Sequence, residues 1–333
     1  MEKAEQKITI QDIADKAGVA KSTVSRYLNN GYISEEKAAV IDKVIQQTGY
    51  RENFFAKRLK TKHSRLIGIV MPRFDSYSAG KLLTGFNAAL EQNGYQALIL
   101  VSDLRSEKEI ANIRRLMGQG VDGIIVQSVG ITDEHLKLAA EAPVPLIFTG
   151  QSHPDVFYVK VNDYRAGRLM GEYIAKLGHD KAVYLGVSAS DVAVGQKRRQ
   201  GFEEGFAAHN PHGSTAFVET DFSFDKAYEQ GAAVMKHNPT AVVCATDNIA
   251  LGLLRYLHEN NIRVPQDVSL AGFGGYPFGS VAYPSLTSLA FDYEYLGAKT
   301  AQKLLMILKG KKVKSEFDDH MIFITRESTR AVK

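Results

Sequence analysis

The sequence predicts an α/β protein in which a small all-α N-terminal unit precedes a larger body of two α/β subdomains with parallel sheets. Apolar residues repeat with helical spacing over the first 50 residues or so. From Arg65 onward, short apolar runs rich in β-branched residues alternate with segments of helical pattern, and this plan starts again near Asp180. A chain of 333 residues is long enough for two or three domains.

Composition narrows the class of protein. The chain is 44% hydrophobic and 23% charged, as folded domains are, and no run approaches the roughly 18 consecutive apolar residues of a membrane span. The start, MEKAEQKITI, lacks the apolar segment of a signal peptide. The single cysteine, Cys244, excludes an internal disulfide and fits a reducing compartment. We therefore expect a cytoplasmic protein with no membrane partner.

Charge is distributed unevenly along the chain. Residues 1–65 hold 13 Lys and Arg against 8 Asp and Glu, whereas the remainder holds 28 against 29. A basic head on a near-neutral body is typical of a polyanion-binding module joined to another domain. Charge alone fits an ordinary solvated set of helices equally well.

The head has the pattern of a helix-turn-helix unit. A first helix carries the apolar stripe Ile10, Ile13, Ala14 and Ala17, starts at a capping box of Thr9 and Asp12, and ends at Gly18. A second helix follows over AKSTVSRYLNN, in which Val24 and Leu28 face the first. A third begins after Ser34, ends at Gly49 and is expected to bury Val40, Ile41, Val44 and Ile45. Two helices joined by a short glycine turn and held by a third predict DNA binding.

In such a unit the second helix lies in the major groove. Lys21, Ser22 and Arg26 point away from the Val24 and Leu28 face and are predicted to contact base edges. Thr23, Ser25, Tyr27 and Asn30 are predicted to contact phosphates. The alternative is an amphipathic surface helix with no nucleic-acid partner.

The stretch ITIQDIADKAGVAKSTVSRYLNN and the segment that follows, ISEEKAAVIDKVIQQTGYRENFFAKRLKTKHSRLIGIV, resemble the headpiece of the LacI/GalR family of bacterial transcription regulators. The resemblance continues along essentially the whole chain. It implies a DNA-binding headpiece over residues 1–52 and a hinge helix or linker over 53–65. In that hinge, Leu59 beside Lys60 would wedge into the minor groove of the operator. Without the resemblance, this segment reads as a basic linker helix.

The same resemblance implies a periplasmic-binding-protein type I body over residues 66–333. Its N-subdomain would comprise about 66–162 plus 292–320, and its C-subdomain about 163–291 plus 321–333. Strands are expected from the residue pattern over 65–72, 95–103, 121–128, 144–150, 180–188, 241–247 and 267–274, and helices over 79–94, 107–120 and 197–210.

Polar residues follow the expected strands, where open α/β sheets bind their ligands. The predicted effector-binding residues are Arg73, Asp75, Ser76, Gln151, Asp191, Lys197, Arg198, Asp247 and Tyr276. Because they come from both halves of the body, we expect them to converge on one cleft. Two alternatives stay open: Asp247 could be the N-cap of the next helix, and Lys197 a solvated helix residue.

Carboxylates, arginines and amides beside aromatic rings suit a sugar, and Arg73 with Arg198 and nearby Lys197 could hold a phosphate. The segments RFDS, GITDEHL, YLGVSASDVAVGQKRR and CATDNIALG look most like the trehalose/sucrose operon repressor branch of the family. That resemblance implies a disaccharide or disaccharide phosphate as effector. Gly274-Gly275 stands where many family members carry an acidic residue. This difference weakens any transfer of ligand-binding roles from the lactose-type effector site, and it agrees with the trehalose/sucrose branch.

Together these observations predict a sequence-specific transcriptional regulator, a repressor of a sugar-utilisation operon that binds palindromic double-stranded operator DNA as a homodimer. The resemblance implies a dimer, because the sequence after IFITREST lacks the apolar heptad tail of tetrameric members of that family. We expect no catalytic residues, metal or cofactor, since metal-ligand clusters, a G-x-S-x-G motif and a P-loop are missing from the sequence. The alternatives are a solute-binding protein without a transcriptional role, a sugar-metabolising enzyme, and a corepressor-dependent regulator.

Overall fold

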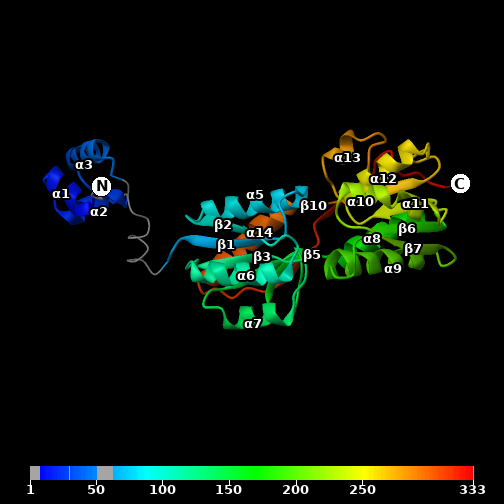
Figure 1. Cartoon of the computed structure of the whole chain (residues 1–333), viewed down its shortest axis with the longest axis horizontal. Coiled ribbons are helices and arrows are strands. Elements are labelled where there is room, and N and C mark those ends of the chain that lie inside the picture. The colour runs from blue at the N-terminus through cyan, green and yellow to red at the C-terminus, as the bar shows by residue number, and fades with distance from the viewer. Residues whose placement is uncertain (1–7, 30, 51–62, 333) are drawn as a thin grey trace, which may run out of the picture. The chain divides into compact units, whose positions relative to one another are not determined.

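The computed structural model describes residues 8–29, 31–50 and 63–332 (Figure 1). The chain divides into two compact units, Met1–Ser64 and Arg65–Lys333. Three predicted DNA contacts, Asn30, Leu59 and Lys60, lie outside the described residues. Within the described ranges, no helix combines the length and apolar character needed to cross a membrane.

The first unit has the expected helix-turn-helix arrangement. Helix α1 (Ile10–Ala17) begins at a capping box in which Asp12 Oδ2 accepts from the Thr9 backbone N–H at 2.8 Å. It ends at Gly18, whose φ of 63° lies in the left-handed region that favours glycine. Helices α2 (Lys21–Leu28) and α3 (Glu35–Thr48) follow.

These helices share a small apolar core of Ile13, Ala14, Val24, Ile41 and Val44. The expected burial of Val40 is wrong, because its side chain is 42% exposed. Ile41 and Val44 define the packed face of α3, and Val40 lies at the edge of that face, about 70° around the helix from its centre. The residues that do pack hold α2 against α1 and α3 and leave the polar side of α2 toward solvent.

The body confirms the α/β class with two sheets. The first has the strand order β11-β5-β4-β3-β1-β2, and its strands are parallel. Its strands are β1 (Leu66–Met71), β2 (Gln96–Val101), β3 (Gly123–Gln127), β4 (Leu146–Thr149), β5 (Phe157–Val161) and β11 (Glu316–Asp318). The near-continuous apolar runs of β1, β3 and β4 match burial on both faces of a parallel sheet.

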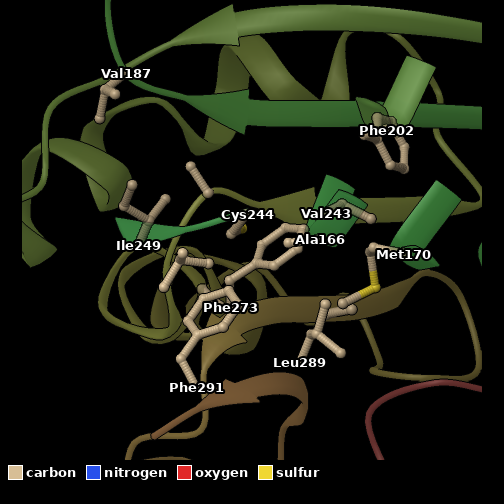
Figure 2. Close-up of a cluster of buried hydrophobic side chains, with 14 of the residues drawn as sticks. Ala166, Met170, Val187, Phe202, Val243, Cys244, Ile249, Phe273, Leu289 and Phe291 are labelled. Carbon is tan, nitrogen blue, oxygen red and sulfur yellow. The ribbon is translucent and has the colours of Figure 1, made fainter. Parts of the chain in front are cut away.

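The second sheet has the order β12-β10-β9-β8-β6-β7, with β12 antiparallel to β10 and the other pairs parallel. Its strands are β6 (Lys181–Gly186), β7 (Ser214–Glu219), β8 (Ala241–Cys244), β9 (Ser269–Gly274), β10 (Thr287–Phe291) and β12 (Met321–Ile324). Figure 2 shows part of its core, where Phe273, Leu289 and Phe291 meet Met170.

Helices cover both faces of each sheet (Figure 1). In the first half they are α5 (Tyr77–Glu91), α6 (Ser106–Gly118), α7 (Asp133–Glu141) and α14 (Tyr293–Leu308). In the second half they are α8 (Asp163–Lys176), the π-helix η1 (Val192–Arg198), α9 (Arg199–His209), α10 (Phe224–Glu229), α11 (Gly231–Met235), α12 (Asp247–Glu259) and α13 (Phe278–Val281).

The chain passes between the two sheets three times: from β5 to α8, from β10 to α14, and from β11 to β12. Both crossover helices begin with a side-chain cap. Asn162 Oδ1 accepts from the Arg165 N–H at 3.2 Å, and Asp292 Oδ1 accepts from the Tyr295 N–H at 2.9 Å. These crossovers bring the carboxyl ends of the strands from the two sheets to a common region.

Candidate functional site

A cavity of about 250 Å³ lies in the body where strands from both sheets end. Seven of the nine predicted effector residues line it: Arg73, Asp75, Ser76, Gln151, Asp191, Arg198 and Tyr276. Parallel strands end at the same edge of a sheet, which explains why residues so far apart in sequence converge. Each of the seven is positioned by contacts that also define what it can offer a ligand.

Arg198 is the more deeply buried of the two cations that line the cavity. It ends the π-helix η1, and its Nη2 donates to Oδ1 of Asp163 at 2.6 Å while Nη1 donates to the Ala245 carbonyl at 2.7 Å. The Asp163 Oδ2 atom also pairs with Lys160 Nζ at 3.1 Å. Burial raises the pKa of Asp163, but the charges of Arg198 and Lys160 outweigh it and hold this pKa below its usual value.

Gln151 bridges the two subdomains. Its Nε2 donates both to the Val129 carbonyl at 3.0 Å and to Asp191 Oδ1 at 2.9 Å. Since both partners are acceptors, the amide has one orientation, which leaves Oε1 as the atom available to a ligand. Asp191 also caps η1 by accepting from the Val194 N–H at 2.9 Å, and burial raises its pKa.

Arg73 and Ser76 follow β1. The Nε atom of Arg73 pairs with Asp75 Oδ1 at 2.9 Å, and the guanidinium lies 5.8 Å from the centre of the Phe222 ring in the other half of the body. Asp75 is largely exposed, so its pairing with Arg73 can be exchanged for a ligand anion. Ser76 accepts from the Ala79 N–H at 3.1 Å and so caps α5.

Asp247 behaves differently from both sequence expectations. It does not line the cavity, and the N-cap of α12 is Thr246, whose hydroxyl accepts from the Ile249 N–H. The buried Asp247 carboxylate instead accepts from the Tyr276 N–H and from Ser288 Oγ, both at 2.6 Å. Burial raises its pKa to about 6. Asp247 is therefore a positioning residue for the segment that carries Tyr276.

Lys197 does not belong to the cavity wall. Its side chain is exposed, and Nζ reaches Gln200 Oε1 at 3.4 Å. The neighbouring Arg198 is buried and points inward, so of the two residues only Arg198 belongs to the cavity wall. Lys197 is therefore a solvated helix residue, as the alternative prediction had it. Lys197 is no longer a candidate for binding a phosphate group of the effector.

Several cavity residues were not anticipated from the sequence. The ring centres of Tyr77 and Tyr276 lie 4.9 Å apart, one from each half of the body. Others that sequence reasoning missed are Ser78, Gln127, Ser128, Val129, Thr149, Asp163, Phe222, Thr246, Asn248 and Tyr293. A signal was present for Tyr77 and Asn248, because they stand beside predicted residues in PRFDSYS and CATDN. Among the described side chains, no group of three or more His, Cys, Asp and Glu is arranged to hold a metal ion.

In the head unit, the outer face of α2 is polar and open. Lys21, Ser22, Ser25 and Arg26 are exposed, and Thr23 is half-buried. Tyr27 is partly committed inside the unit, since it packs on the core and its hydroxyl donates to Asp42 Oδ1 at 3.0 Å. A Cβ at Gly31 would lie 2.6 Å from Cγ of Arg26, so the loop after α2 supports the stem of that arginine. The DNA contacts of these side chains stay predictions.

A basic helix-turn-helix unit joined to a body with a polar, aromatic-lined cavity defines the class: a ligand-responsive, DNA-binding regulator. The family model "Bacterial regulatory proteins, lacI family" matches residues 9–53, and "Periplasmic binding protein-like domain" matches residues 172–329. The chain belongs to the LacI family, whose members are DNA-binding transcriptional regulators and not enzymes.

Individual relatives and solved structures support the same family. The sucrose operon repressor of Staphylococcus xylosus is 33% identical, over 90% of this chain and 93% of that protein. The transcriptional regulator TreR of Escherichia coli is 28% identical, over 92% and 96%. The lac repressor dimer, solved bound to operator and the anti-inducer ONPF, has a TM-score of 0.89 at 25% identity and covers 98% of this chain and 100% of its own. The trehalose repressor of Escherichia coli shares the fold, with a TM-score of 0.70 at 23% identity, covering 79% of this chain and 100% of its own.

Proposed function

We propose that this protein represses a sugar-utilisation operon and that a disaccharide or disaccharide phosphate bound in the body cavity controls its release from operator DNA. The observation that carries the proposal is the cavity itself, which combines fixed hydrogen-bonding groups with aromatic rings. Sugars need donors and acceptors for their hydroxyls and flat apolar surfaces for their ring faces. The names of the relatives, a sucrose operon repressor and TreR, support the same class of effector.

The polar groups suit a polyol. Gln151 offers Oε1 as an acceptor, whereas Arg198 offers those N–H groups that Asp163 and the Ala245 carbonyl leave free. The tyrosine pair of Tyr77 and Tyr276 supplies ring surface from both halves of the body. A ligand that contacts both halves binds one arrangement of the subdomains more tightly than another, and that difference in affinity is the basis of control.

Arg73 is our candidate for a phosphate group. Its guanidinium pairs with an exposed carboxylate, Asp75, that a phosphate can replace. Arg198 is a weaker candidate, because it is committed to a buried carboxylate. The phosphate proposal therefore rests on Arg73 and no longer on Lys197.

For the head we propose that Lys21, Ser22 and Arg26 read bases, that Thr23, Ser25, Tyr27 and Asn30 hold phosphates, and that Leu59 with Lys60 enters the minor groove. Two such heads in a homodimer match the two halves of a palindromic operator. We also propose that the chain divides into a headpiece (1–52), a hinge (53–65) and a body (66–333), as the resemblance to the family implies. A regulator that acts on bacterial DNA works in the cytoplasm.

The test is operator binding by gel shift, titrated with a panel of sugars and sugar 6-phosphates. We expect retention of DNA by the free protein and release by one disaccharide or its phosphate. Retention strengthened by a sugar would instead make the protein corepressor-dependent. Binding of sugars without any binding of operator DNA would support the solute-binding alternative.

A further inference from the structure

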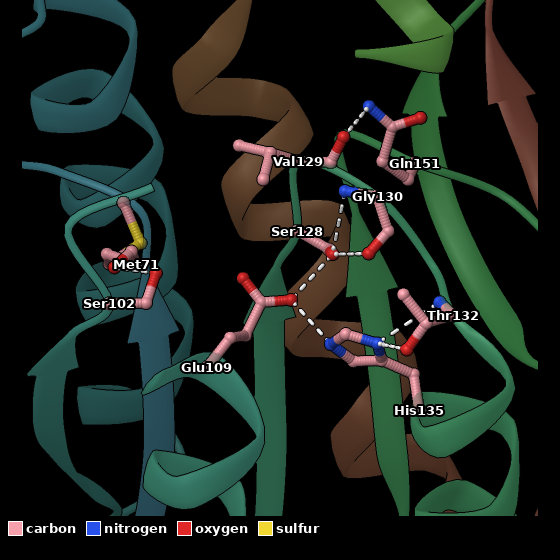
Figure 3. A network of polar contacts seen from close by, with 9 residues as sticks. All are labelled: Met71, Ser102, Glu109, Ser128, Val129, Gly130, Thr132, His135 and Gln151. Atoms are coloured by element: carbon pink, nitrogen blue, oxygen red, sulfur yellow. Dashed lines mark hydrogen bonds and ion pairs between the residues drawn. The ribbon is translucent and has the colours of Figure 1, made fainter. Parts of the chain in front are cut away.

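Behind the cavity wall lies a buried polar pair that the proposed mechanism does not use. Glu109 on α6 and His135 on α7 are 1% and 0% exposed, and Nε2 of His135 lies 2.8 Å from Oε1 of Glu109 (Figure 3). Neither residue lines the cavity. Polar groups are costly to bury, so such a pair calls for a reason.

The hydrogen bonds fix the form of the histidine. The backbone N–H of Thr132 donates to Nδ1 of His135 at 3.2 Å, so Nδ1 carries no proton. The ring is therefore neutral with its proton on Nε2, which it donates to Glu109. The same bond to Thr132 completes the capping box of α7, and Phe148 packs edge-on against the ring. His135 thus has a single orientation, aimed at Glu109.

Glu109 connects His135 to Ser128, a residue of the cavity wall. Its Oε1 also accepts from Ser128 Oγ at 2.6 Å. The Ser128 hydroxyl in turn accepts from the Gly130 N–H at 3.2 Å and lies 2.7 Å from the Gly130 carbonyl. The other carboxyl oxygen, Oε2, is buried and has no hydrogen-bond partner among the described residues. The hydrogen bonds from His135 and Ser128 are therefore both accepted by one oxygen of Glu109, Oε1.

The loop held by Ser128 is one of the places where the two halves of the body meet. The Val129 carbonyl accepts from Gln151 Nε2, and the same nitrogen donates to Asp191 of the other half. A Cβ on Gly130 would stand 3.8 Å from the backbone oxygen of Ser190, which also belongs to the other half. Figure 3 shows this chain of contacts running from His135 through Ser128 to Gln151.

We propose that Glu109 and His135 are positioning residues of the effector site. They hold residues 128–130 so that the Val129 carbonyl fixes the Gln151 amide against Asp191 and leaves Oε1 of Gln151 turned to the ligand. The effect on ligand affinity rests on the proposed function of the cavity. The effect on the Gln151 amide does not, because it follows from the protein's own hydrogen bonds.

The unpartnered Oε2 supplies a matched pair of variants. Glu109→Gln keeps an oxygen for His135 and Ser128 and puts the amide nitrogen where no bond is lost, whereas Glu109→Leu removes both bonds. Ser128→Ala breaks the same chain of hydrogen bonds without altering a buried carboxylate. Because Ser128 itself lines the cavity, its decisive readout is exchange of the Gln151 amide in the ligand-free protein, and that measurement decides the question if Glu109→Leu does not fold.

Two measurements on the full-length protein test the proposal. The first is hydrogen exchange of the Gln151 side-chain amide by NMR without ligand, and the second is calorimetric affinity for sucrose 6-phosphate and trehalose 6-phosphate. We expect Glu109→Leu and Ser128→Ala to speed the exchange of the Gln151 amide. Both variants should also bind the sugar 6-phosphate that the parent protein binds about tenfold more weakly than the parent does. Glu109→Gln should keep both properties.

A purely structural role predicts otherwise. Lower melting temperatures in Glu109→Leu and Ser128→Ala, with parental Gln151 exchange and parental affinity, would overturn the proposal. Failure of both phosphates to bind the parent would count against the proposed effectors, and the exchange measurement would still decide the positioning role.

Discussion

Arg198 Nη2 lies 2.6 Å from Oδ1 of Asp163, and both side chains are almost completely buried in the body. Asp163 is the first residue of α8, directly after the chain leaves the first sheet, and Arg198 ends the π-helix η1. The guanidinium lies 5.0 Å from the centre of the Phe273 ring and 5.2 Å from that of Phe291. Lys160 on β5 contributes a second cation to Asp163. This ion cluster joins a crossover to the cavity wall.

We expect Asp163→Asn to destabilise the protein by about 3–5 kcal/mol, because it leaves two buried cations without their carboxylate. The measurement is urea unfolding at pH 7. Glu259→Gln is the matched control, since it breaks the exposed pair with Arg255 and should change stability little. Equal unfolding midpoints for the two variants would contradict the importance of the buried cluster.

A pH dependence is expected from Asp247, whose pKa burial raises to about 6. A carboxyl group with a raised folded-state pKa contributes stability that is present below its unfolded pKa and lost as the pH rises through its folded pKa. The difference in unfolding free energy between the parent and Asp247→Asn should therefore fall by about 3 kcal/mol at most between pH 4 and pH 6. Above pH 7 it should be constant. Chemical unfolding across this range measures it, and a difference that rises with pH would refute the assignment.

Much of this arrangement follows from the residue pattern, and some does not. Apolar runs followed by polar residues predicted β1 to β4, β6, β8 and β9, but not β5, β7, β10, β11 and β12. They also predicted the edge at which Arg73, Gln151 and Arg198 meet, because parallel strands share that edge. The partners of a buried carboxylate are a different matter. Asp247 binds residues 29 and 41 positions away, and no local pattern records such contacts.

The other wrong predictions concerned which residues of a helix face inward. Val40 and Lys197 each stand beside a buried residue, and the sequence does not say which neighbour turns inward. For Lys197 the difficulty was greater, since η1 is a π-helix whose spacing differs from the 3.6-residue period. Glu109 and His135 also escaped prediction, because each reads as an ordinary polar helix residue until α6 and α7 are placed together.

For the head, we expect Arg26→Ala to weaken operator binding by roughly 1–3 kcal/mol and to relax base preference at one position. Fluorescence anisotropy with operators substituted at each position measures both effects. Tyr27→Phe is the control, because it removes only the hydroxyl bonded to Asp42. It should leave the base preference as in the parent. An Arg26→Ala protein that discriminates bases like the parent would refute base reading by Arg26.

For the cavity, Arg73→Ala should weaken binding of the phosphorylated disaccharide by about tenfold or more and affect the unphosphorylated sugar less, because a charge-assisted bond is lost. Lys197→Ala should change neither affinity, since Lys197 lies outside the cavity. Isothermal calorimetry with trehalose, sucrose and their 6-phosphates gives all the values. If the parent shows no preference for the phosphates, the phosphate part of the proposal fails.

The packing of α8 against α9 depends on glycine. A Cβ at Gly201 would stand 2.0 Å from the backbone oxygen of Tyr164, and backbone cannot move aside as a flexible side chain can. We expect Gly201→Ala to lower stability by about 1–3 kcal/mol through this overpacking. Gly80 in α5 offers the contrast, because a Cβ there meets nothing within 4 Å. Gly80→Ala should therefore stabilise the protein by about 0.5–1 kcal/mol through helix propensity. Thermal unfolding of both variants tests the pair, and a shift of the same sign in each would mean that propensity, and not the close helix contact, governs position 201.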